Sequence, residues 1–272
     1  MRTLLHLSDL HFGRVDSALI EPLLASAAQL GPDVVVVSGD LTQRARHEEF
    51  EKARHFLDRL PSPQIIVPGN HDVPLHNVLS RFLNPLGKYQ RYICRDLEPA
   101  YVDDEMAVLG LNSARSLTIK GGRITARQIQ SLRDRLWALD PALTKVVVSH
   151  HPFDLPQAHV ARDLIGRAAL AMRMFADCGA DLLLAGHLHV SSTGSTAQRY
   201  KIGRYAALVV LAGTAISTRA RGESKSFNVI RITRGRIDVE RRRWNPTRDD
   251  FEVSARESFR RGADGWALAG AS

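Results

Sequence analysis

The hydrophobic residues of this chain fall into short runs that are separated by longer amphipathic stretches. The short runs contain few polar positions and are rich in Val, Ile and Leu, which is typical of strands buried on both faces of a sheet. We predict such strands at residues 3–7, 33–37, 64–67, 106–111, 145–148 and 181–184. The stretches between them predict helices at residues 18–30, 48–60, 125–139 and 164–178. Buried strands that alternate with helices predict a layered α/β fold.

The pattern changes after residue 190. From Ser191 to Asn245 the helical spacing stops, and short β-like runs are separated by glycines. Residues 233–236, Thr-Arg-Gly-Arg, form a natural hairpin turn between two of these runs. This part of the chain therefore predicts a β-meander.

The length and local composition predict one principal domain with two less regular segments. At 272 residues the chain can bury a large core, and we expect the domain to cover residues 1–245. Residues 74–104 are rich in Arg, Tyr and Pro and interrupt the strand and helix pattern, so we expect a cap or lid insertion there. Residues 246–272 place three aromatic residues in polar surroundings. We expect this last segment to be a C-terminal arm packed on the domain.

The composition narrows the function classes only a little. The chain has 37 Lys and Arg against 29 Asp and Glu, and its net charge of +8 favours an anionic partner. The basic residues are scattered, so nucleic acid is not the favoured one. Cys94 and Cys178 lack the spacing of a disulfide framework or a thiolate zinc site. The sequence has neither an apolar stretch of membrane-spanning length nor a signal peptide, and we expect a cytoplasmic protein.

Side chains that can bind metal ions follow directly on the ends of the predicted strands. In layered α/β folds the loops at this edge converge to build sites. The candidate ligands are Asp9, His11, Asp40, Asn70, His150, His187 and His189. Asp9 and His11 are two residues apart, so in extended backbone their side chains point to the same side, and His187 and His189 repeat this spacing. Asp40 supplies a carboxylate that can bridge two cations.

The donor types restrict the metal. Carboxylate and amide oxygens combined with imidazole nitrogens, without thiolate, favour Mn²⁺, Fe, Zn²⁺ or Co²⁺ over Ca²⁺ or a copper electron-transfer centre. The ligands alone do not select one of these four metals.

Five short motifs occur in one order along the chain, each after a predicted strand. They are Asp9-x-His11, Gly39-Asp40, Gly69-Asn70-His71-Asp72, Ser149-His150-His151 and Gly186-His187-x-His189. Together they resemble the signature of the calcineurin-like metallophosphoesterases, in particular the bacterial phosphodiesterases similar to class III cyclic-nucleotide phosphodiesterases. The resemblance implies a four-layer α/β/β/α sandwich with two mixed β-sheets and a dinuclear metal site at the strand ends.

The resemblance also implies how the ligands divide between two divalent ions. One ion would take Asp9, His11, Asp40 and His189, and the other would take Asp40, Asn70, His150 and His187. A hydroxide that bridges the ions would attack phosphorus in line. His71, next to a ligand, would be the general acid that protonates the leaving oxygen.

One departure from the family pattern bears on the substrate. The phosphoprotein phosphatases of this superfamily read Gly-Asp-x-x-Asp-Arg-Gly, whereas this chain has Gln43 in place of the second carboxylate. This argues against a protein serine/threonine phosphatase and leaves His71 without the carboxylate that would orient it. Asp72 is the nearest substitute by sequence.

Three further residues are candidates for contact with the substrate. His76 follows the Gly-Asn-His-Asp motif, His151 is adjacent to a candidate ligand, and Arg115 follows the predicted strand at 106–111. For Arg115, a phosphate contact and an ordinary loop arginine remain equally open.

The leading interpretation is a phosphodiesterase that acts on a small phosphodiester such as a 3′,5′-cyclic nucleotide. A UDP-sugar-lipid pyrophosphatase, with peripheral contact to a membrane surface, and a DNA nuclease are alternatives within the same superfamily. A non-catalytic metal-binding scaffold is the alternative from another class, although such a protein would be expected to have lost ligands. A homodimer is left open.

Overall fold

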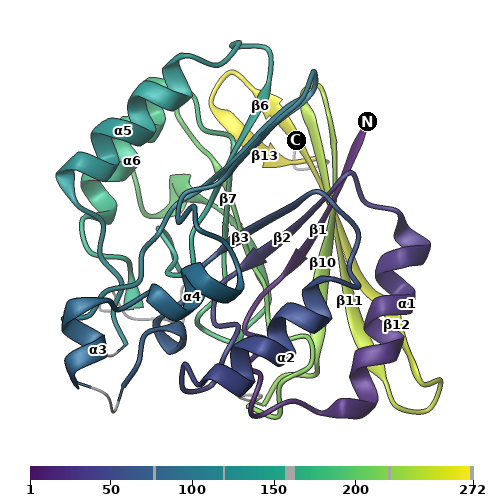
Figure 1. Cartoon of the computed structure of the whole chain (residues 1–272). Helices are drawn as coiled ribbons and strands as arrows, with labels where there is room; N and C mark the ends of the chain where they lie inside the picture. The colour runs from purple at the N-terminus through teal and green to yellow at the C-terminus, as the bar shows by residue number, and fades with distance from the viewer. Residues whose placement is uncertain (76–77, 119, 157–162, 220–221, 270–272) are drawn as a thin grey trace.

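The computed structural model contains the whole chain, and the residues it describes are 1–75, 78–118, 120–156, 163–219 and 222–269. Two β-sheets pack face to face, and helices cover the outer face of each (Figure 1). The predicted four-layer α/β/β/α sandwich is therefore confirmed. None of the described helices is long and apolar enough to cross a bilayer.

The first sheet has seven strands within the described residues, in the order β13-β12-β11-β10-β1-β2-β3. Its parallel part is formed by β1 (Arg2–Leu7), β2 (Val34–Ser38) and β3 (Gln64–Val67). The antiparallel part is formed by β10 (Ser226–Thr233), β11 (Arg236–Asn245), β12 (Asp250–Gly262) and β13 (Gly265–Leu268). The predicted hairpin turn at 233–236 joins β10 to β11, with Thr233 opposite Arg236.

The second sheet, over the same part of the chain, has six strands in the order β4-β5-β6-β7-β9-β8. Parallel pairing joins β5 (Met106–Gly110), β6 (Thr144–Val148), β7 (Leu182–Ala185) and β9 (Leu208–Leu211). The edges are the antiparallel strands β4 (Ala100–Val102) and β8 (Ser192–Ser195). Both sheets are mixed, as the resemblance implied.

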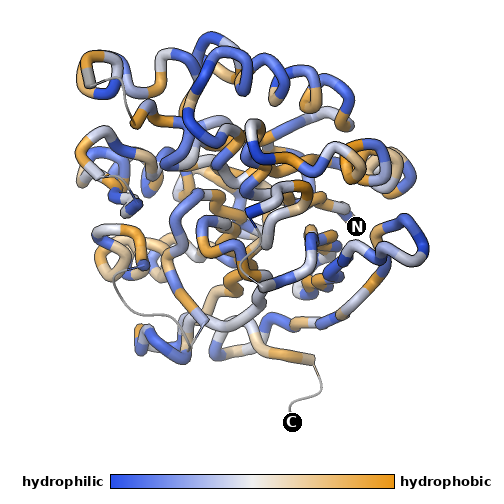
Figure 2. Tube along the Cα trace, turned by 90° about the horizontal axis from the view of Figure 1, so that it is seen from below, coloured by the Kyte–Doolittle hydropathy of each residue, from blue (hydrophilic) through white to orange (hydrophobic). Residues whose placement is uncertain are grey.

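Helices cover the outer face of both sheets. Figure 1 shows α1 (Ile20–Leu30) and α2 (His47–Leu57) on the side of the first sheet, and α5 (Ala126–Trp137) and α6 (Ala168–Cys178) on the side of the second. The helices at the rim carry hydrophobic and hydrophilic residues in alternation (Figure 2), so that one face of each can pack on a sheet. The short helices α3 (Val78–Leu83) and α4 (Gly87–Tyr92) lie in the segment that we expected to be a cap or lid.

Three separate hydrophobic clusters hold the four layers together. Along β1, Leu4 faces the other sheet, whereas Leu5 and Leu7 face the helices, because successive side chains of a strand point to opposite faces. The same alternation along β2 sends Val34 and Val36 inward between the sheets. Each fully buried Leu or Val contributes about 1.5–3 kcal/mol to stability. Burial on both faces explains why these strands read as continuous apolar runs.

The C-terminal segment forms part of the first sheet. Over its described part, residues 246–269, it forms β12 and β13, which extend the first sheet beyond β11. Phe251 packs against Phe227 in the cluster under α1. Trp266 lies between the sheets. Its Nε1 donates to Oδ1 of Asp181, the residue before β7 of the second sheet, at 2.8 Å. Its aromatic residues therefore serve the main cores.

Candidate metal centre

The seven candidate ligands converge at one edge of the sandwich. They lie on the loops that follow β1, β2, β3, β6 and β7, where the carboxyl ends of the parallel strands meet. Six of the seven side chains are buried, and His187 is half-buried. Asn70 lies in a short 3₁₀ helix (Asn70–Asp72) directly after β3. The fold thus brings together ligands that are separated by up to 180 positions in sequence.

One group of donor atoms surrounds a point between the loops after β1 and β7. His11 Nε2 lies 3.2 Å from His189 Nε2 and 3.6 Å from Asp9 Oδ1. His189 Nε2 lies 3.3 Å from Asp9 Oδ1, and Asp40 Oδ2 lies 3.8 Å from His11 Nε2. Ligands bound to one ion at about 2.0–2.2 Å are separated from one another by about 3.0–3.6 Å. Asp9, His11 and His189 are therefore spaced as the ligands of a single ion, and Asp40 lies slightly farther away.

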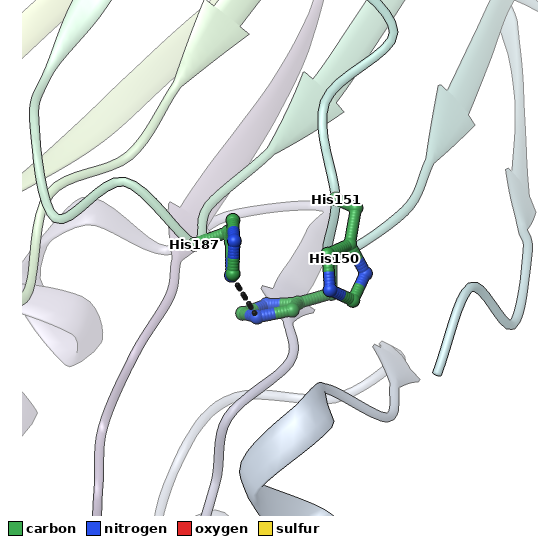
Figure 3. A group of neighbouring side chains, drawn as sticks. All are labelled: His150, His151 and His187. Atoms are coloured by element: carbon green, nitrogen blue, oxygen red, sulfur yellow. Dashed lines mark hydrogen bonds between the residues drawn. The ribbon is translucent and has the colours of Figure 1, made fainter. Parts of the chain in front are cut away.

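A second group shares Asp40 with the first. His150 Nε2 lies 3.1 Å from Asn70 Oδ1 and 3.4 Å from Asp40 Oδ2. The ring of His187 points toward His150, with Nδ1 3.3 Å from Nε2 (Figure 3). How these side chains divide between two ions stays a prediction from the family resemblance.

Hydrogen bonds to the main chain select the nitrogen that faces each group. Nδ1 of His150 donates to the carbonyl of Ser38 at 2.8 Å, and Nδ1 of His189 donates to the carbonyl of Arg219 at 3.1 Å. His11 makes a longer bond of the same kind, 3.4 Å, to Thr42. A proton held on Nδ1 leaves the lone pair of Nε2 free for a metal ion.

The backbone at the centre is strained. Asp9, His11, Asp40, His187 and His189 all have positive φ, between 50° and 72°, a region that few residues other than glycine adopt. The expectation that Asp9 and His11 lie in extended backbone was therefore wrong, although their side chains still converge. Residues are held in such conformations only when the surrounding structure fixes them, and they concentrate at functional sites.

The site contains two buried carboxylates, and neighbouring histidines offset part of their charge. Burial acts to raise the pKa of Asp40, but the neighbouring histidines His150 and His11 outweigh it and hold that pKa well below its usual range. Conversely, burial acts against charge on His150, and the carboxylate of Asp40 raises its pKa to about 9. Asp9 Oδ1 is buried without a hydrogen-bond donor among the described residues. Two buried carboxylates, one with an oxygen left without a donor, fit a pair of divalent cations.

Comparison with known proteins identifies the family. The sequence profile of the calcineurin-like phosphoesterases matches residues 2–191, which include all seven candidate ligands. The chain belongs to this family. The recognition of the family from its five motifs is thereby confirmed.

Curated proteins that resemble this chain include two bacterial phosphodiesterases. A glycerophosphodiester phosphodiesterase of Enterobacter lignolyticus is 29% identical over 168 residues, which is 58% of this chain and 59% of that protein. A cAMP/cGMP dual specificity phosphodiesterase of Mycobacterium tuberculosis is 27% identical over 213 residues, which is 71% of this chain and 63% of that protein. The chain thus spans about three fifths of the length of these relatives.

Solved structures agree on the fold. A purple acid phosphatase from yellow lupin superposes with a TM-score of 0.70 at 10% identity, over 94% of this chain and 53% of that chain. A dimetal phosphatase from Danio rerio superposes with a TM-score of 0.63 at 16% identity, over 93% and 98% of the two chains. At these identities the likeness shows the four-layer fold of the family and nothing finer.

His71 of this family member lies beside the centre and is oriented by the main chain. Its Nδ1 donates to the carbonyl of Gln43 at 2.8 Å, and its amide donates to Asp40 Oδ1 at 2.8 Å. The main-chain carbonyl of Gln43, not a side-chain carboxylate, therefore orients the ring of His71. Nδ1 carries the proton in this arrangement, which leaves Nε2 as a hydrogen-bond acceptor.

Asp72 does not orient His71, contrary to the suggestion from its position in the sequence. Its carboxylate accepts hydrogen bonds from the amides of Leu41, Thr42 and Gly69. Burial and the charge of Asp40 raise the pKa of Asp72 to about 6. Asp72 therefore ties the loop after β2 to the loop after β3.

Sequence reasoning missed Arg219, which lies on the loop after β9. Its Nη1 donates to His71 Nε2 at 2.8 Å and lies 3.4 Å from Gln43 Oε1. The loop is brought to the centre by hydrogen bonds from Thr214 Oγ1 to the carbonyl of Asp9 and from the amide of Thr218 to the carbonyl of Arg14. Arginines are numerous in this sequence and no spacing distinguishes this one, so only the fold reveals it.

The three predicted substrate contacts have different outcomes. His76 lies outside the described residues. Arg115 is half-buried and donates from Nε to the carbonyl of Arg123 at 3.0 Å. His151 is 1% exposed, and it packs behind His150 and His187 (Figure 3). Both of its ring nitrogens are hydrogen-bonded, to Ser113 and to Lys120, which argues against the expected contact of His151 with substrate.

A substitution at Gly186 is expected to disrupt the centre. A Cβ added there would lie 1.8 Å from Ser8 Oγ and 2.4 Å from Asp9 Oδ2. We expect Gly186→Ala to displace Asp9 and to lower metal affinity about tenfold or more, because second-layer changes at metal sites have effects of this size. Metal content after equilibrium dialysis would measure this. Gly194→Ala is the matched control, since a Cβ on Gly194 meets no atom within 4 Å; equal metal content in the two variants would contradict the prediction.

Proposed function

We propose that this chain is a dinuclear metal-dependent phosphodiesterase. The observation that carries the proposal is the arrangement of seven donor side chains in two groups that share Asp40, with separations suited to two adjacent ions. Asp9, His11, Asp40 and His189 would hold one ion, and Asn70, His150 and His187 would hold the other together with Asp40. When bound, two such ions supply activation of water and neutralisation of charge on the phosphoryl oxygens.

His71 is the proposed proton donor to the leaving oxygen. The bond from its Nδ1 to Gln43 keeps the ring in a fixed orientation, and Nε2 accepts from Arg219. Burial lowers the pKa of His71, while the carboxylate of Asp40 opposes this effect. To act as the acid, His71 must carry a second proton, on Nε2, in the substrate complex, after Arg219 has left that nitrogen. That proton would pass to the leaving alkoxide, which is the group that most needs help in the hydrolysis of an alkyl diester.

Arg219 is proposed to bind a non-bridging oxygen of the phosphoryl group. Its guanidinium contacts Nε2 of His71, so it occupies the place where the substrate's phosphorus and leaving oxygen would lie. A guanidinium prefers a charged phosphoryl oxygen to a neutral imidazole nitrogen. Substrate binding would therefore draw Arg219 away from His71 and leave Nε2 facing the leaving group.

The proposed substrate class rests on the names of the curated relatives and on the proposed role of His71 as the acid. Both curated relatives described above are phosphodiesterases by name, one for glycerophosphodiesters and one for cyclic nucleotides. We propose a small phosphodiester, with 3′,5′-cyclic nucleotides as the leading candidate. A UDP-sugar lipid and DNA are retained as alternatives because they share the phosphodiester or pyrophosphate linkage.

A substrate panel tests this proposal. The protein would be loaded separately with Mn²⁺, Fe²⁺, Zn²⁺ and Co²⁺ and assayed with bis(p-nitrophenyl) phosphate, p-nitrophenyl phosphate, cyclic AMP, a UDP-lipid and single-stranded DNA. We expect the diester to exceed the monoester in kcat/KM by about tenfold or more, since each 1.36 kcal/mol of preference gives a factor of ten. Two equivalents of bound metal without cleavage of any member would contradict the proposal and favour a non-catalytic scaffold.

A further inference from the structure

Three arginines lie near one another on the segments that connect β5 to α5 and β6 to α6. Arg115, Arg123 and Arg167, here called the arginine cluster, come from three different segments of the chain. Arg115 donates from Nε to the carbonyl of Arg123 at 3.0 Å, and Arg167 donates from Nη1 to the carbonyl of Ile124 at 2.8 Å. Each bond uses one nitrogen of a guanidinium and leaves its other nitrogens for a ligand.

The main chain fixes the three segments relative to one another. The amide of Arg123 donates to the carbonyl of Ser113 at 3.1 Å, and Arg123 forms a parallel bridge with Gly166. The amide of Gly166 donates in turn to the carbonyl of Gly122 at 2.8 Å. The positions of the three arginines are therefore set by the fold and do not depend on a ligand.

In the part of the chain that the structure describes, no carboxylate pairs with these three arginines. Within the described residues none of the three guanidinium groups lies within 4.0 Å of a carboxylate oxygen, and the remaining residues of the chain contain no Asp or Glu. Burial together with the charges of Arg123 and Arg167 lowers the pKa of Arg115. Like charges held together without a counter-charge cost stability, and a bound anion would remove that cost.

The helix starts add to the positive potential. Arg167 is the N-cap of α6, and Thr125, two residues after Arg123, is the N-cap of α5. Neither helix has an acidic residue in its first turn. The N-terminal end of a helix carries a partial positive charge, which is usually matched by such acidic residues.

The arginine cluster is joined to the metal centre through His151. Ser113 Oγ donates to His151 Nδ1 at 2.8 Å, and the carbonyl of Lys120 accepts from His151 Nε2 at 3.0 Å. The ring of His151 lies 4.5 Å, centroid to centroid, from that of His187. One histidine layer thus separates the cluster's loop from the second ligand group.

There is also space next to Arg115. A cavity of about 410 Å³ lies between the loop after β5 and the segment that contains α3 and α4. Asn84, Gln90, Asn112 and Ser116 contribute polar side chains to its wall, together with Arg115. The rest of the wall is apolar, from Pro85, Leu86, Leu97, Ala114 and Leu117, and the size of the cavity suits part of a small-molecule ligand.

We propose that the arginine cluster binds a second phosphate of the substrate, so that the enzyme prefers phosphodiesters that carry an additional phosphomonoester group. The proposal rests on the proposed function, because it concerns the part of the substrate that does not react. Charge-assisted hydrogen bonds from arginine to a phosphate dianion supply both the affinity and the orientation.

A pair of chromogenic esters tests the proposal. Thymidine 5′-(p-nitrophenyl phosphate) would be compared with the same ester bearing a 3′-phosphate. For the wild-type holoenzyme we expect kcat/KM to be about tenfold or more higher for the 3′-phosphorylated ester, and the ratio to fall as NaCl is raised. Arg123→Ala is expected to lose most of this ratio and to keep its activity on the ester without the 3′-phosphate. The Arg123 side chain is exposed, so this variant should fold; Arg115→Ala and Arg167→Ala extend the test.

Arg173→Ala is the matched control. Arg173 is exposed on α6, and its substitution removes one positive charge outside the arginine cluster. Equal kcat/KM for the two esters in the wild type, or equal ratios in Arg123→Ala and the wild type, would overturn the proposal. So would a loss of affinity for a DNA oligonucleotide in the cluster variants with no change in the ratio. If neither ester is cleaved, the proposed function fails instead. Calorimetric binding of thymidine 3′,5′-bisphosphate against thymidine 5′-phosphate then decides the subsite independently of turnover: equal affinities would overturn it.

Discussion

Asp40→Asn is expected to lower kcat/KM by about 10³-fold or more and to reduce bound metal from two equivalents to one or fewer. Asp40 is the side chain that both ligand groups share, through Oδ2 contacts to His11 and His150. Its carboxylate is the charge best placed to hold two cations side by side. Metal ions contribute several kcal/mol to stabilising the charge of such transition states, and 1.36 kcal/mol corresponds to a factor of ten in rate. Metal analysis and steady-state kinetics on bis(p-nitrophenyl) phosphate would measure the two losses together.

The metal-free protein should lose stability with the same substitution. Asp40 and Asp9 are both buried, and without cations their charges are compensated only by histidines such as His150, whose pKa Asp40 raises. Because the neighbouring histidines hold the pKa of Asp40 well below its usual range, its ionised carboxylate stabilises the metal-free fold at neutral pH, so we expect metal-free Asp40→Asn to melt at a lower temperature than the metal-free wild type. Asp134→Asn, at an exposed position on α5, is the matched control. Full metal content together with full activity in Asp40→Asn would rule out the shared-ligand role.

The sequence was sufficient to predict the layers and the neighbourhood of the site. Both faces of the parallel strands are buried, so β1 and β2 appear as continuous apolar runs, and ligands placed at their ends had to meet in space. The sequence could not predict the local geometry. Asp9 and His11 adopt left-handed backbone because the loop after β1 pairs with the loop after β2. The amides of Asp9 and His11 donate hydrogen bonds to the carbonyls of Gly39 and Asp40. Such contacts between loops leave no periodic pattern.

The surroundings of His71 show the same limit more clearly. Sequence position favoured Asp72 as its partner, yet the partners are the carbonyl of Gln43 and the guanidinium of Arg219. A main-chain carbonyl can orient a histidine whatever side chain the residue carries, so Gln43 gives no signal in sequence. Arg219 is 148 residues away and reaches His71 only because the loop after β9 crosses the ends of the first sheet.

His71→Ala is expected to affect substrates according to their leaving group. Turnover of a diester with an alkyl leaving group, such as cyclic AMP, should fall about 10²–10⁴-fold, which is the usual contribution of general acid catalysis. Hydrolysis of bis(p-nitrophenyl) phosphate should change little, because p-nitrophenolate leaves without a proton. The basic limb of the kcat/KM profile for the alkyl diester, which reports loss of the acid's proton, should disappear. His55→Ala, at an exposed position on α2, serves as the control.

Arg219→Ala separates the two roles assigned beside the centre. Since Arg219 is proposed to bind the phosphoryl group that all substrates share, its loss should lower kcat/KM by a similar factor for good and poor leaving groups. Loss of His71 should instead produce a large difference between them, with two equivalents of metal still bound. Equal losses on both substrates in His71→Ala would show that His71 also acts in binding or positioning and would contradict its assignment as the acid. A leaving-group dependence in Arg219→Ala would place the guanidinium in proton transfer, through its contact with Nε2 of His71.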